Sequence, residues 1–366
     1  MIPIARPTIG VEEINAVCDV LKSGNVAQGQ KVKELEESFA KFIGANHAVA
    51  VNSGTAALHC SLYSTGVKQG DEVITVPFTF IATANSIMMQ GAKPVFVDIE
   101  DETFNIDAKK IEEKITKRTK AIIAVDLYGN PYEYGDVHEI SLKHGIKIIE
   151  DACQAVGAEY RGKKCGTLGD ISCFSFYATK NMITAEGGMI ATDNPDYANN
   201  VKMFRNHGQS EKTRYDYVDI GYNYRMTDVL AAIGIEQLKK LSKFTEARIQ
   251  NAEYLTKTLT KIKGISVPVV KNRNRHVFHQ YTIKVEEDFR LTRDELIEYL
   301  NKKGVGCSVH YPKPLHLYNH IKKFGYKIGD FPVAEKLVKQ VISLPVHPNL
   351  TIKQLDYIID VFKGLE

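Results

Sequence analysis

Residues 48–58 have the sequence AVAVNSGTAAL, in which a short apolar run passes through a glycine into a helical pattern. Four apolar residues in succession are typical of a strand that is buried on both faces, as in a parallel sheet. Ser53 stands where a helix that continues to Ser64 would be capped. This stretch therefore predicts a strand, a tight turn and a helix, which together form the repeating unit of an α/β fold.

The same alternation continues outward from this unit through the first half of the chain. Helical spacing separates most of the apolar runs, for example over Thr55–Ser64 and Gly135–His144. We therefore expect a large α/β domain built around a mainly parallel sheet. The predicted strands are Ala48–Val51, Glu72–Val76, Pro94–Ile99, Ala121–Leu127, Lys147–Glu150, Ile171–Phe176 and Gly188–Thr192.

The second half of the chain has a different pattern, which predicts a compact α+β unit after Pro268. Two helices are expected to lead into it, Met226–Leu241 and Lys243–Leu259. The predicted order is then strand Gln280–Val285, helix Thr292–Lys303, strand Ser308–Tyr311 and two terminal helices that Ser343–Val346 interrupts. We place the large domain, with its N-terminal arm, at residues 1–242 and the small C-terminal domain at residues 243–366.

The composition is that of an ordinary globular protein, with 366 residues, 44% hydrophobic and 25% charged. A formal net charge of +3 indicates no large excess of basic residues, so we expect no nucleic-acid partner. No apolar run approaches the roughly 20 residues of a membrane helix, and the first residues lack a signal-peptide pattern, so we expect a cytoplasmic protein without a membrane partner. The cysteines are scattered, and we predict buried reduced thiols at Cys18, Cys60, Cys153, Cys165, Cys173 and Cys307.

Ser53-Gly54-Thr55 is one candidate for a phosphate-binding turn. Free N–H groups at a helix start, the positive end of the helix dipole and two hydroxyls attract an anion, and the glycine permits close approach. The alternative is a simple helix cap. The segment has neither the Gly-Lys-Ser/Thr of a Walker loop nor the glycine pattern of a dinucleotide site.

Asp151 stands at the carboxyl end of a predicted strand, where ligands collect in open α/β sheets. A buried carboxylate needs a partner, and a protonated ring nitrogen would be one because a charge-assisted hydrogen bond offsets the cost of burial. Glu150 competes for this role, but neighbouring strand residues point to opposite faces. The structural alternative for Asp151 is a helix cap.

Lys180 follows the predicted strand Ile171–Phe176 and precedes the pair Gly187-Gly188. Partial burial there would lower its pKa and favour imine formation, whereas the alternative is an ordinary solvated lysine. Ser175 offers a further phosphate contact. A phosphate cup, a strand-end acid and a reactive lysine together match what pyridoxal phosphate requires: an anchor, a partner for the ring nitrogen and a Schiff-base amine.

Longer motifs along nearly the whole chain resemble one family, the DegT/DnrJ/EryC1/StrS sugar aminotransferases. The motifs are SGTAAL (53–58), PFTFIATAN (77–85), EDACQA (150–155), FSFYATKNMITAEGG (174–188), GYNYRMTD (221–228), HYPKPLH (310–316) and SLPVHP (343–348). The resemblance implies a pyridoxal-phosphate-dependent transferase of fold type I, like aspartate aminotransferase. Such a protein has a mixed seven-stranded sheet in its large domain, a smaller α+β domain, and active sites shared across a homodimer.

The resemblance also implies roles for single residues. Lys180 would form the Schiff base, and Asp151 would face the ring nitrogen. Phe80 would stack on the ring, and Gln154 would contact the ring hydroxyl. If the resemblance did not extend to function, Phe80 would be an ordinary core residue.

The remaining implied roles concern the phosphate and the substrate. The phosphate ligands would be Gly54, Thr55 and Ser175, with Asn223 contributed by the neighbouring subunit or, as the structural alternative, serving as a turn residue. More distant matches to the sugar-nucleotide pocket of relatives are Arg225, His310 and Tyr311. His316 and His320 stand four residues apart, but no third metal ligand is evident, so we expect a solvated helical face and no metal site.

The activity that the resemblance implies is transfer of an amino group from L-glutamate to a nucleotide-linked keto-sugar. Many members that act at sugar carbon four have histidine where Tyr177 stands, and tyrosine with a following Lys-Asn also occurs among those that act at carbon three. Thr184–Gly188 is closer to the carbon-four type, so we favour a 4-keto-6-deoxy sugar, with a 3-keto-sugar as the alternative.

Three other functions are compatible with the motifs. A branch of the family dehydrates sugars, but it carries histidine in place of the lysine, and Lys180 argues against it. An aminotransferase for free amino acids would use the same cofactor. A regulatory or sensor protein that retains only the fold is the non-enzymatic alternative, and the presence of every chemical residue argues against it.

Overall fold

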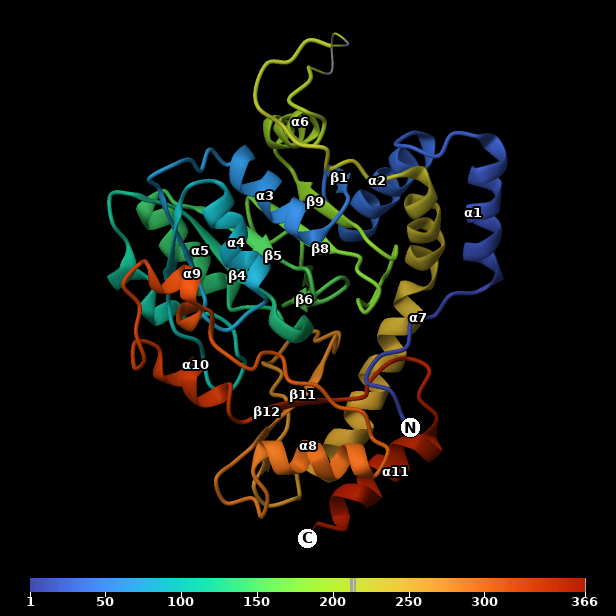
Figure 1. The fold of residues 1–366 in the computed structure, drawn as a ribbon, viewed down its shortest axis with the longest axis vertical. Coiled ribbons are helices and arrows are strands. Elements are labelled where there is room, and N and C mark those ends of the chain that lie inside the picture. The colour runs from blue at the N-terminus through green and yellow to red at the C-terminus, as the bar shows by residue number, and fades with distance from the viewer. Residues whose placement is uncertain (211–212, 214, 366) are drawn as a thin grey trace.

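The computed structural model describes residues 1–210, 213 and 215–365. Its larger unit is built on a mixed sheet of seven strands with helices on both faces (Figure 1). The strands are β1 His47–Val51, β2 Glu72–Thr75, β3 Lys93–Phe96, β4 Thr119–Val125, β5 Lys147–Asp151, β8 Ile171–Ser175 and β9 Gly188–Thr192. Their order is β1-β9-β8-β5-β4-β2-β3, in which β9 runs antiparallel to both neighbours and the other pairs are parallel. The seven predicted strands and the α/β class are thus confirmed.

The central strands are apolar throughout because both faces of the sheet are covered. In β4, Ile122 and Ala124 face one core, together with residues of the helix α2 Gln30–Ile43. The intervening residues Ala121 and Ile123 face the opposite core, beneath α3 Gly54–Ser64. Alternation of side chains along each strand therefore divides one apolar sequence between two cores.

The connections between the strands are mostly short helices. Ser53 caps α3 by accepting a hydrogen bond from the N–H of Ala56 at 3.1 Å. The other helices of the larger unit are α4 Ile81–Met89, α5 Tyr134–His144 and α6 Pro195–Phe204. Short 3₁₀ turns occupy Ala108–Lys110, Glu112–Lys114 and Leu127–Gly129, and a small hairpin pairs β6 Glu159–Tyr160 with β7 Lys163–Lys164.

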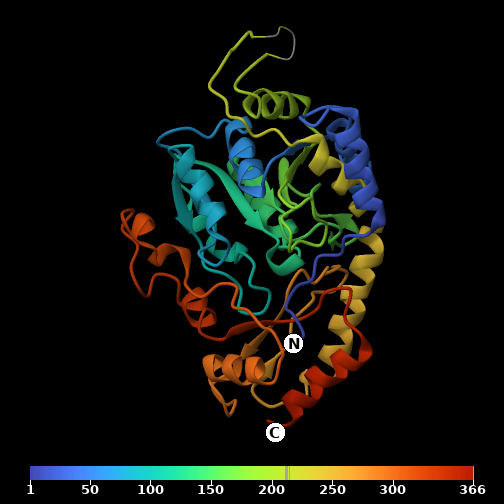
Figure 2. The same cartoon turned by 45° about the vertical axis from the view of Figure 1, so that its right-hand side comes forward.

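One helix, α7 Asp228–Leu259, replaces the two helices that the sequence predicts over residues 226–259. The prediction of a break was wrong because buried side chains continue at helical spacing through it, as Leu241, Thr245 and Arg248 show. Both α1 Val11–Ser23 and α2 pack on α7, which extends from the larger unit to the smaller one (Figure 2). The domain boundary after residue 242 stays a prediction, since α7 runs through it without interruption.

The smaller unit contains a three-stranded antiparallel sheet, packed with α8 Arg293–Lys302 and α11 Ile352–Lys363. Its strands, in spatial order, are β10 Ile265–Ser266, β11 Tyr281–Val285 and β12 Val341–Leu344. Between α8 and β12 lie the 3₁₀ turn Leu315–Leu317, α9 Asn319–Lys322 and α10 Pro332–Leu337. The first residues of the chain also lie here, since the N–H of Ile2 donates to the carbonyl of Gly304 at 2.7 Å.

One prediction for the smaller unit was wrong and another was incomplete. Residues 308–311 form only a single bridge, between Ser308 and Ser343, because Pro312 cannot donate and the Tyr311 side chain turns toward Gln154. Residues 343–346 do lie between two helices, α10 and α11, as predicted, but the sequence did not indicate that the first two belong to the strand β12, whose four side chains are all buried. Among the described residues, no helix is both long enough and apolar enough to span a membrane.

Candidate active site

A cleft of about 420 Å³ lies at the carboxyl end of the parallel strands, and residues of both units line it. Asp151 ends β5 and Ser175 ends β8, so neighbouring strands deliver them to the same edge of the sheet. The first turns of α3 and α4 contribute further residues to the lining. From the smaller unit come His279, Gln280, His310 and Tyr311.

Asp151 is only 5% exposed and accepts two hydrogen bonds from neutral groups. Its Oδ2 accepts from the Thr83 hydroxyl at 2.9 Å, and its Oδ1 accepts from the N–H of Cys153 at 3.3 Å. Within the described part of the chain it forms no ion pair. A buried carboxylate in this state is a ready partner for a cationic donor that enters the cleft.

Lys180 lies in the loop that follows β8 and lines the same cleft. Burial lowers the pKa of its ammonium group, and the nearby Cys153 and Asp151 oppose this only in part. Its Nζ forms no ion pair with any residue that the structure describes. A lysine in this environment is more readily deprotonated, and the free amine is the nucleophilic form.

The start of α3 forms a cradle suited to an anion. A Cβ on Gly54 would lie 2.8 Å from the Cβ of Ser175, so only glycine allows this approach. The first N–H groups of the helix have no helical acceptor, and the hydroxyls of Thr55 and Ser175 lie in the same lining. Backbone donors, hydroxyls and the positive helix end together attract a phosphate group.

Phe80 and Gln154 are placed in the cleft by the elements that precede them. Phe80 is the N-terminal cap residue of α4 and is 54% exposed, so it is not a core residue. Gln154 is held at both ends of its amide: Oε1 accepts from the N–H of Tyr128 at 2.7 Å, and Nε2 donates to the Tyr311 hydroxyl at 3.1 Å. These contacts direct the Gln154 amide along the cleft wall.

Asn223 and Arg225 do not line the cleft of their own chain. Both precede α7, in the segment that extends beyond the sheet between α6 and α7 (Figures 1 and 2). The carbonyl of Asn223 accepts from Asn52 at 3.3 Å, and Arg225 donates to Asn206 at 2.7 Å. The Asn223 side chain is exposed.

The sequence from residue 7 to residue 363 matches the model of the DegT/DnrJ/EryC1/StrS aminotransferase family. The chain belongs to this family. The predicted resemblance and the prediction of an aminotransferase are therefore confirmed.

Named relatives of this aminotransferase act on nucleotide-linked sugars. GDP-perosamine synthase of Caulobacter vibrioides is 38% identical, over 98% of this chain and 96% of the relative. A UDP-4-amino-4,6-dideoxy-N-acetyl-beta-L-altrosamine transaminase of Campylobacter jejuni is 36% identical, over 100% of this chain and 98% of the relative.

Solved structures of family members confirm the predicted fold. The putative sugar aminotransferase Spr1654 of Streptococcus pneumoniae, in its PLP form, has a TM-score of 0.94 and 32% identity, covering 100% of this chain and 98% of that chain. The same protein has been solved in a PMP form.

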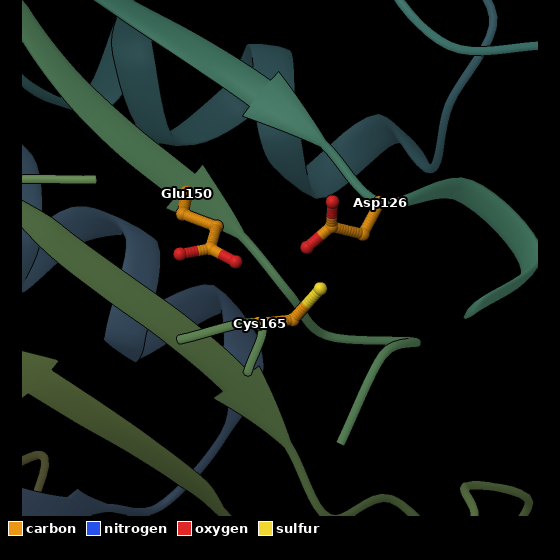
Figure 3. Close-up of side chains that lie close together, drawn as sticks. All are labelled: Asp126, Glu150 and Cys165. Carbon is orange, nitrogen blue, oxygen red and sulfur yellow. The ribbon is translucent and has the colours of Figure 1, made fainter. Parts of the chain in front are cut away.

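Glu150 belongs to a separate buried cluster of this aminotransferase, in which its side chain faces Asp126 and Cys165 (Figure 3). One ligand-type atom of each residue lies within 4.8 Å of the others. The Glu150 oxygens already accept three backbone N–H groups, from residues 166, 168 and 169, at 2.7 to 3.3 Å. Burial and the charge of Glu150 raise the pKa of Asp126 well above its usual value. We interpret the pair as a protonated Asp126 beside an ionised Glu150.

Thr83, His279 and Gln280 are among the polar residues of the cleft that sequence reasoning did not assign to the site. Thr83 lies within the quoted motif PFTFIATAN, but only the fold places its hydroxyl on Asp151. His279 and Gln280 directly precede the strand β11. The sequence feature that could have indicated them is a pair of polar residues immediately before an apolar strand.

The expectation that His316 and His320 share a solvated helical face was wrong for His316. That residue is buried, and its Nε2 lies 3.0 Å from Glu335. His320 instead lies 3.2 Å from Asn85. The cysteine prediction also fails in part, since Cys18 is exposed and Cys153 and Cys307 are only partly buried, whereas Cys60, Cys165 and Cys173 are buried.

Proposed function

We propose that the protein uses pyridoxal phosphate to transfer an amino group from L-glutamate to a nucleotide-linked 4-keto-6-deoxy sugar. One observation carries the proposal: a buried acid without a cation, a lysine with a lowered pKa and an anion cradle meet in one cleft. A cofactor with a basic ring, an aldehyde and a phosphate requires all three.

The residues in the cleft fit this cofactor. Asp151 would hold the protonated ring nitrogen, and the start of α3 with Ser175 would hold the phosphate. Gln154 would meet the ring hydroxyl, and the exposed ring of Phe80 offers an aromatic face. When bound, the cofactor supplies an electron-withdrawing ring that stabilises negative charge at the carbon of the amino donor.

Lys180 is the residue we propose for proton transfer. Its Nζ would take a proton from the donor carbon and return it during the reaction, which requires an amine that is unprotonated near neutral pH. The lowered pKa of Lys180 supports this role. Asp151 would accept a charge-assisted hydrogen bond from the protonated ring nitrogen.

Carbon four is the position that we propose for the new amino group. The segment TAEGG at 184–188 resembles the carbon-four type, and Glu186 lines the cleft. The Campylobacter relative is a transaminase named for a UDP-linked 4-amino-4,6-dideoxy sugar. The alternative is that the protein aminates a 3-keto-sugar, and the substrate screen described below distinguishes the two.

A homodimer with shared sites is the assembly that we propose. Asn223 does not line the cleft of its own chain, and its segment exposes apolar side chains. Tyr217 and Val218 are exposed, and Ile220 is 76% exposed. These exposed apolar side chains lie on one projecting segment, so they are suited to burial against a second copy of the chain.

We also propose that Lys180 forms the Schiff base with the cofactor, and absorbance spectroscopy tests this role. The wild-type protein, reconstituted with pyridoxal phosphate, should show a visible band that Lys180→Ala abolishes and that Lys261→Ala, a change at an exposed lysine, retains. A colourless reconstituted wild type would overturn the assignment. Trapping of the cofactor by borohydride on a side chain other than Lys180 would do the same.

A substrate screen tests the proposed reaction. Nucleotide-linked 4-keto and 3-keto sugars, with glutamate as donor, should give a product mass that corresponds to replacement of the keto oxygen by an amino group. Transfer from glutamate to pyruvate or oxaloacetate, without reaction of any nucleotide-sugar, would contradict the proposed substrate class.

A further inference from the structure

Asn181 directly follows Lys180 in the loop after β8. Its side chain connects this loop to the segment before β11. Its Nδ2 donates to the backbone carbonyl of Val277 at 3.1 Å. Its Oδ1 lies 3.3 Å from Nδ1 of His279. Both Asn181 and His279 are 6% exposed, so these contacts lie within the protein rather than in solvent.

The direction of these hydrogen bonds determines the tautomer of His279. A backbone carbonyl only accepts hydrogen bonds, so the Asn181 amide must present its NH₂ group to Val277 and its oxygen to His279. That oxygen also only accepts, so Nδ1 of His279 must carry the hydrogen. In a neutral imidazole with a hydrogen on Nδ1, Nε2 is an unprotonated acceptor.

His279 remains neutral because its surroundings oppose a positive charge. Burial lowers its pKa well below the usual value, and the nearby basic groups lower it further. These groups are Lys180, Arg248, His310 and His276. The Nε2 lone pair is therefore available throughout the neutral pH range.

The backbone on both sides of His279 is held at the cleft by hydrogen bonds. Arg248 donates to the carbonyls of Phe278 and His279 at 3.3 and 3.5 Å. On either side, the N–H groups of residues 277 and 280 donate to the carbonyls of residues 129 and 128 at 3.0 and 3.3 Å. His279 lines the cleft, and its Nε2 has no hydrogen-bond partner in the described part of the chain.

A neutral acceptor selects its ligand by hydrogen bonding alone. It cannot bind a diphosphate or a carboxylate, since both present acceptors. It requires a donor, and the hydroxyl groups of the sugar are neutral donors of the proposed substrate. His279 shares the cleft with His310 and Tyr311, the residues that resemble those of the sugar-nucleotide pocket.

We propose that His279 accepts a hydrogen bond at Nε2 from a hydroxyl group of the sugar substrate, and that Asn181 is the positioning residue that keeps this nitrogen unprotonated. This inference rests on the proposed reaction with a nucleotide-sugar. It adds a substrate contact that no sequence motif indicated, and it gives the Asn181 side chain a role separate from that of Lys180.

Single-turnover measurements on the two half-reactions of the holoenzyme test the contact with His279. His279→Phe keeps a ring but removes the acceptor, so the sugar half-reaction should require about tenfold more substrate, as expected for one lost hydrogen bond. The half-reaction with glutamate should change much less. His279→Gln, which restores an acceptor oxygen, should recover part of the loss.

A substitution that introduces a negative charge at Asn181 tests the proposed tautomer of His279. In Asn181→Asp, a carboxylate would face Nδ1 and raise the pKa of His279, so that Nε2 carries a hydrogen and becomes a donor. The sugar half-reaction of this variant should weaken at low pH and recover as pH rises, whereas the wild type should show no such transition. Asn181→Leu, which removes both hydrogen bonds without adding charge, should weaken the reaction without this pH dependence.

Nitrogen NMR of histidine-labelled holoenzyme reports the tautomer directly. The His279 signals, identified by their loss in His279→Gln, should show a protonated Nδ1 and a bare Nε2 from pH 6 to pH 9. A protonated Nε2 in the wild type, or an unchanged sugar half-reaction in His279→Phe, would overturn this inference and leave the proposed function intact. Failure of the wild type to aminate any nucleotide-sugar would overturn both.

Discussion

Asp151 and Glu150 are consecutive residues whose carboxylates meet opposite surroundings. Asp151 faces the cleft, whereas Glu150 faces the interior and accepts three backbone N–H groups. Alternation along β5 separates them. The sequence predicted that the two would diverge, but the acid that Glu150 would meet, Asp126, lies 24 residues earlier in the chain.

The proton that we place on Asp126 predicts a pH dependence of stability. The native protein holds this proton at pH values where the unfolded chain has lost it, so the free energy of unfolding should fall as pH rises toward the native pKa. Asp126→Asn supplies a permanent donor of the same shape to Glu150. In this variant, the free energy of unfolding should no longer show the decrease with pH that comes from the Asp126 proton, which is about 1.4 kcal/mol per pH unit.

Urea denaturation between pH 5 and pH 8 measures this effect. Asp136→Asn, a change at an exposed acid in the first turn of α5, provides the control and should leave the slope as it is in the wild type. Equal slopes for Asp126→Asn and the wild type would show that Asp126 is ionised in the native protein.

At the scale of elements, Asp228 joins the starts of two helices. It lies in the first turn of α7, and its carboxylate accepts the N–H groups of Gly29, Lys31 and Val32 at 2.8 to 3.1 Å. These donors belong to the start of α2, so one negative charge is stabilised by two positive helix ends. The long helix α7 thereby fixes α2 against the sheet.

Removal of this carboxylate should destabilise the larger unit. Asp228→Ala leaves three backbone donors without an acceptor and should lower the free energy of unfolding by about 2 to 3 kcal/mol. Asp196→Ala, which removes an exposed acid from the first turn of α6, should cost less than about 1 kcal/mol. Thermal or urea denaturation gives both values, and equal losses in the two variants would contradict the role of Asp228.

At the scale of the whole molecule, the cleft gathers residues from the sheet, from two helix starts and from the smaller unit, but not Asn223. If Asn223 serves the site of a partner subunit, each cleft is complete only in the dimer. The segment that carries Asn223 and the exposed Ile220 projects away from the sheet (Figure 1). A segment that reaches into the partner subunit of a dimer would have this arrangement.

Mixed dimers test this arrangement. Lys180→Ala and Asn223→Asp should each be defective, the second because its charge would repel the cofactor phosphate. A heterodimer would contain one site with both native residues, so re-assembled mixtures should regain roughly a quarter of wild-type activity by random pairing. Activity equal to the mean of the two separate variants would place Asn223 in the site of its own chain.

The sequence alone indicated the seven strands, the α/β class and the family, and it singled out Lys180, Asp151 and Gly54, which the fold brings together in one cleft. These features are local: apolar runs are continuous where both faces of a strand are buried, and reactive residues follow the strand ends in short motifs. The tertiary structure decided the continuity of α7, the closeness of Asp126 and Glu150, and the place of His279 beside Asn181. Those features depend on contacts between residues far apart in the chain, because only folding determines which distant donor meets which acceptor.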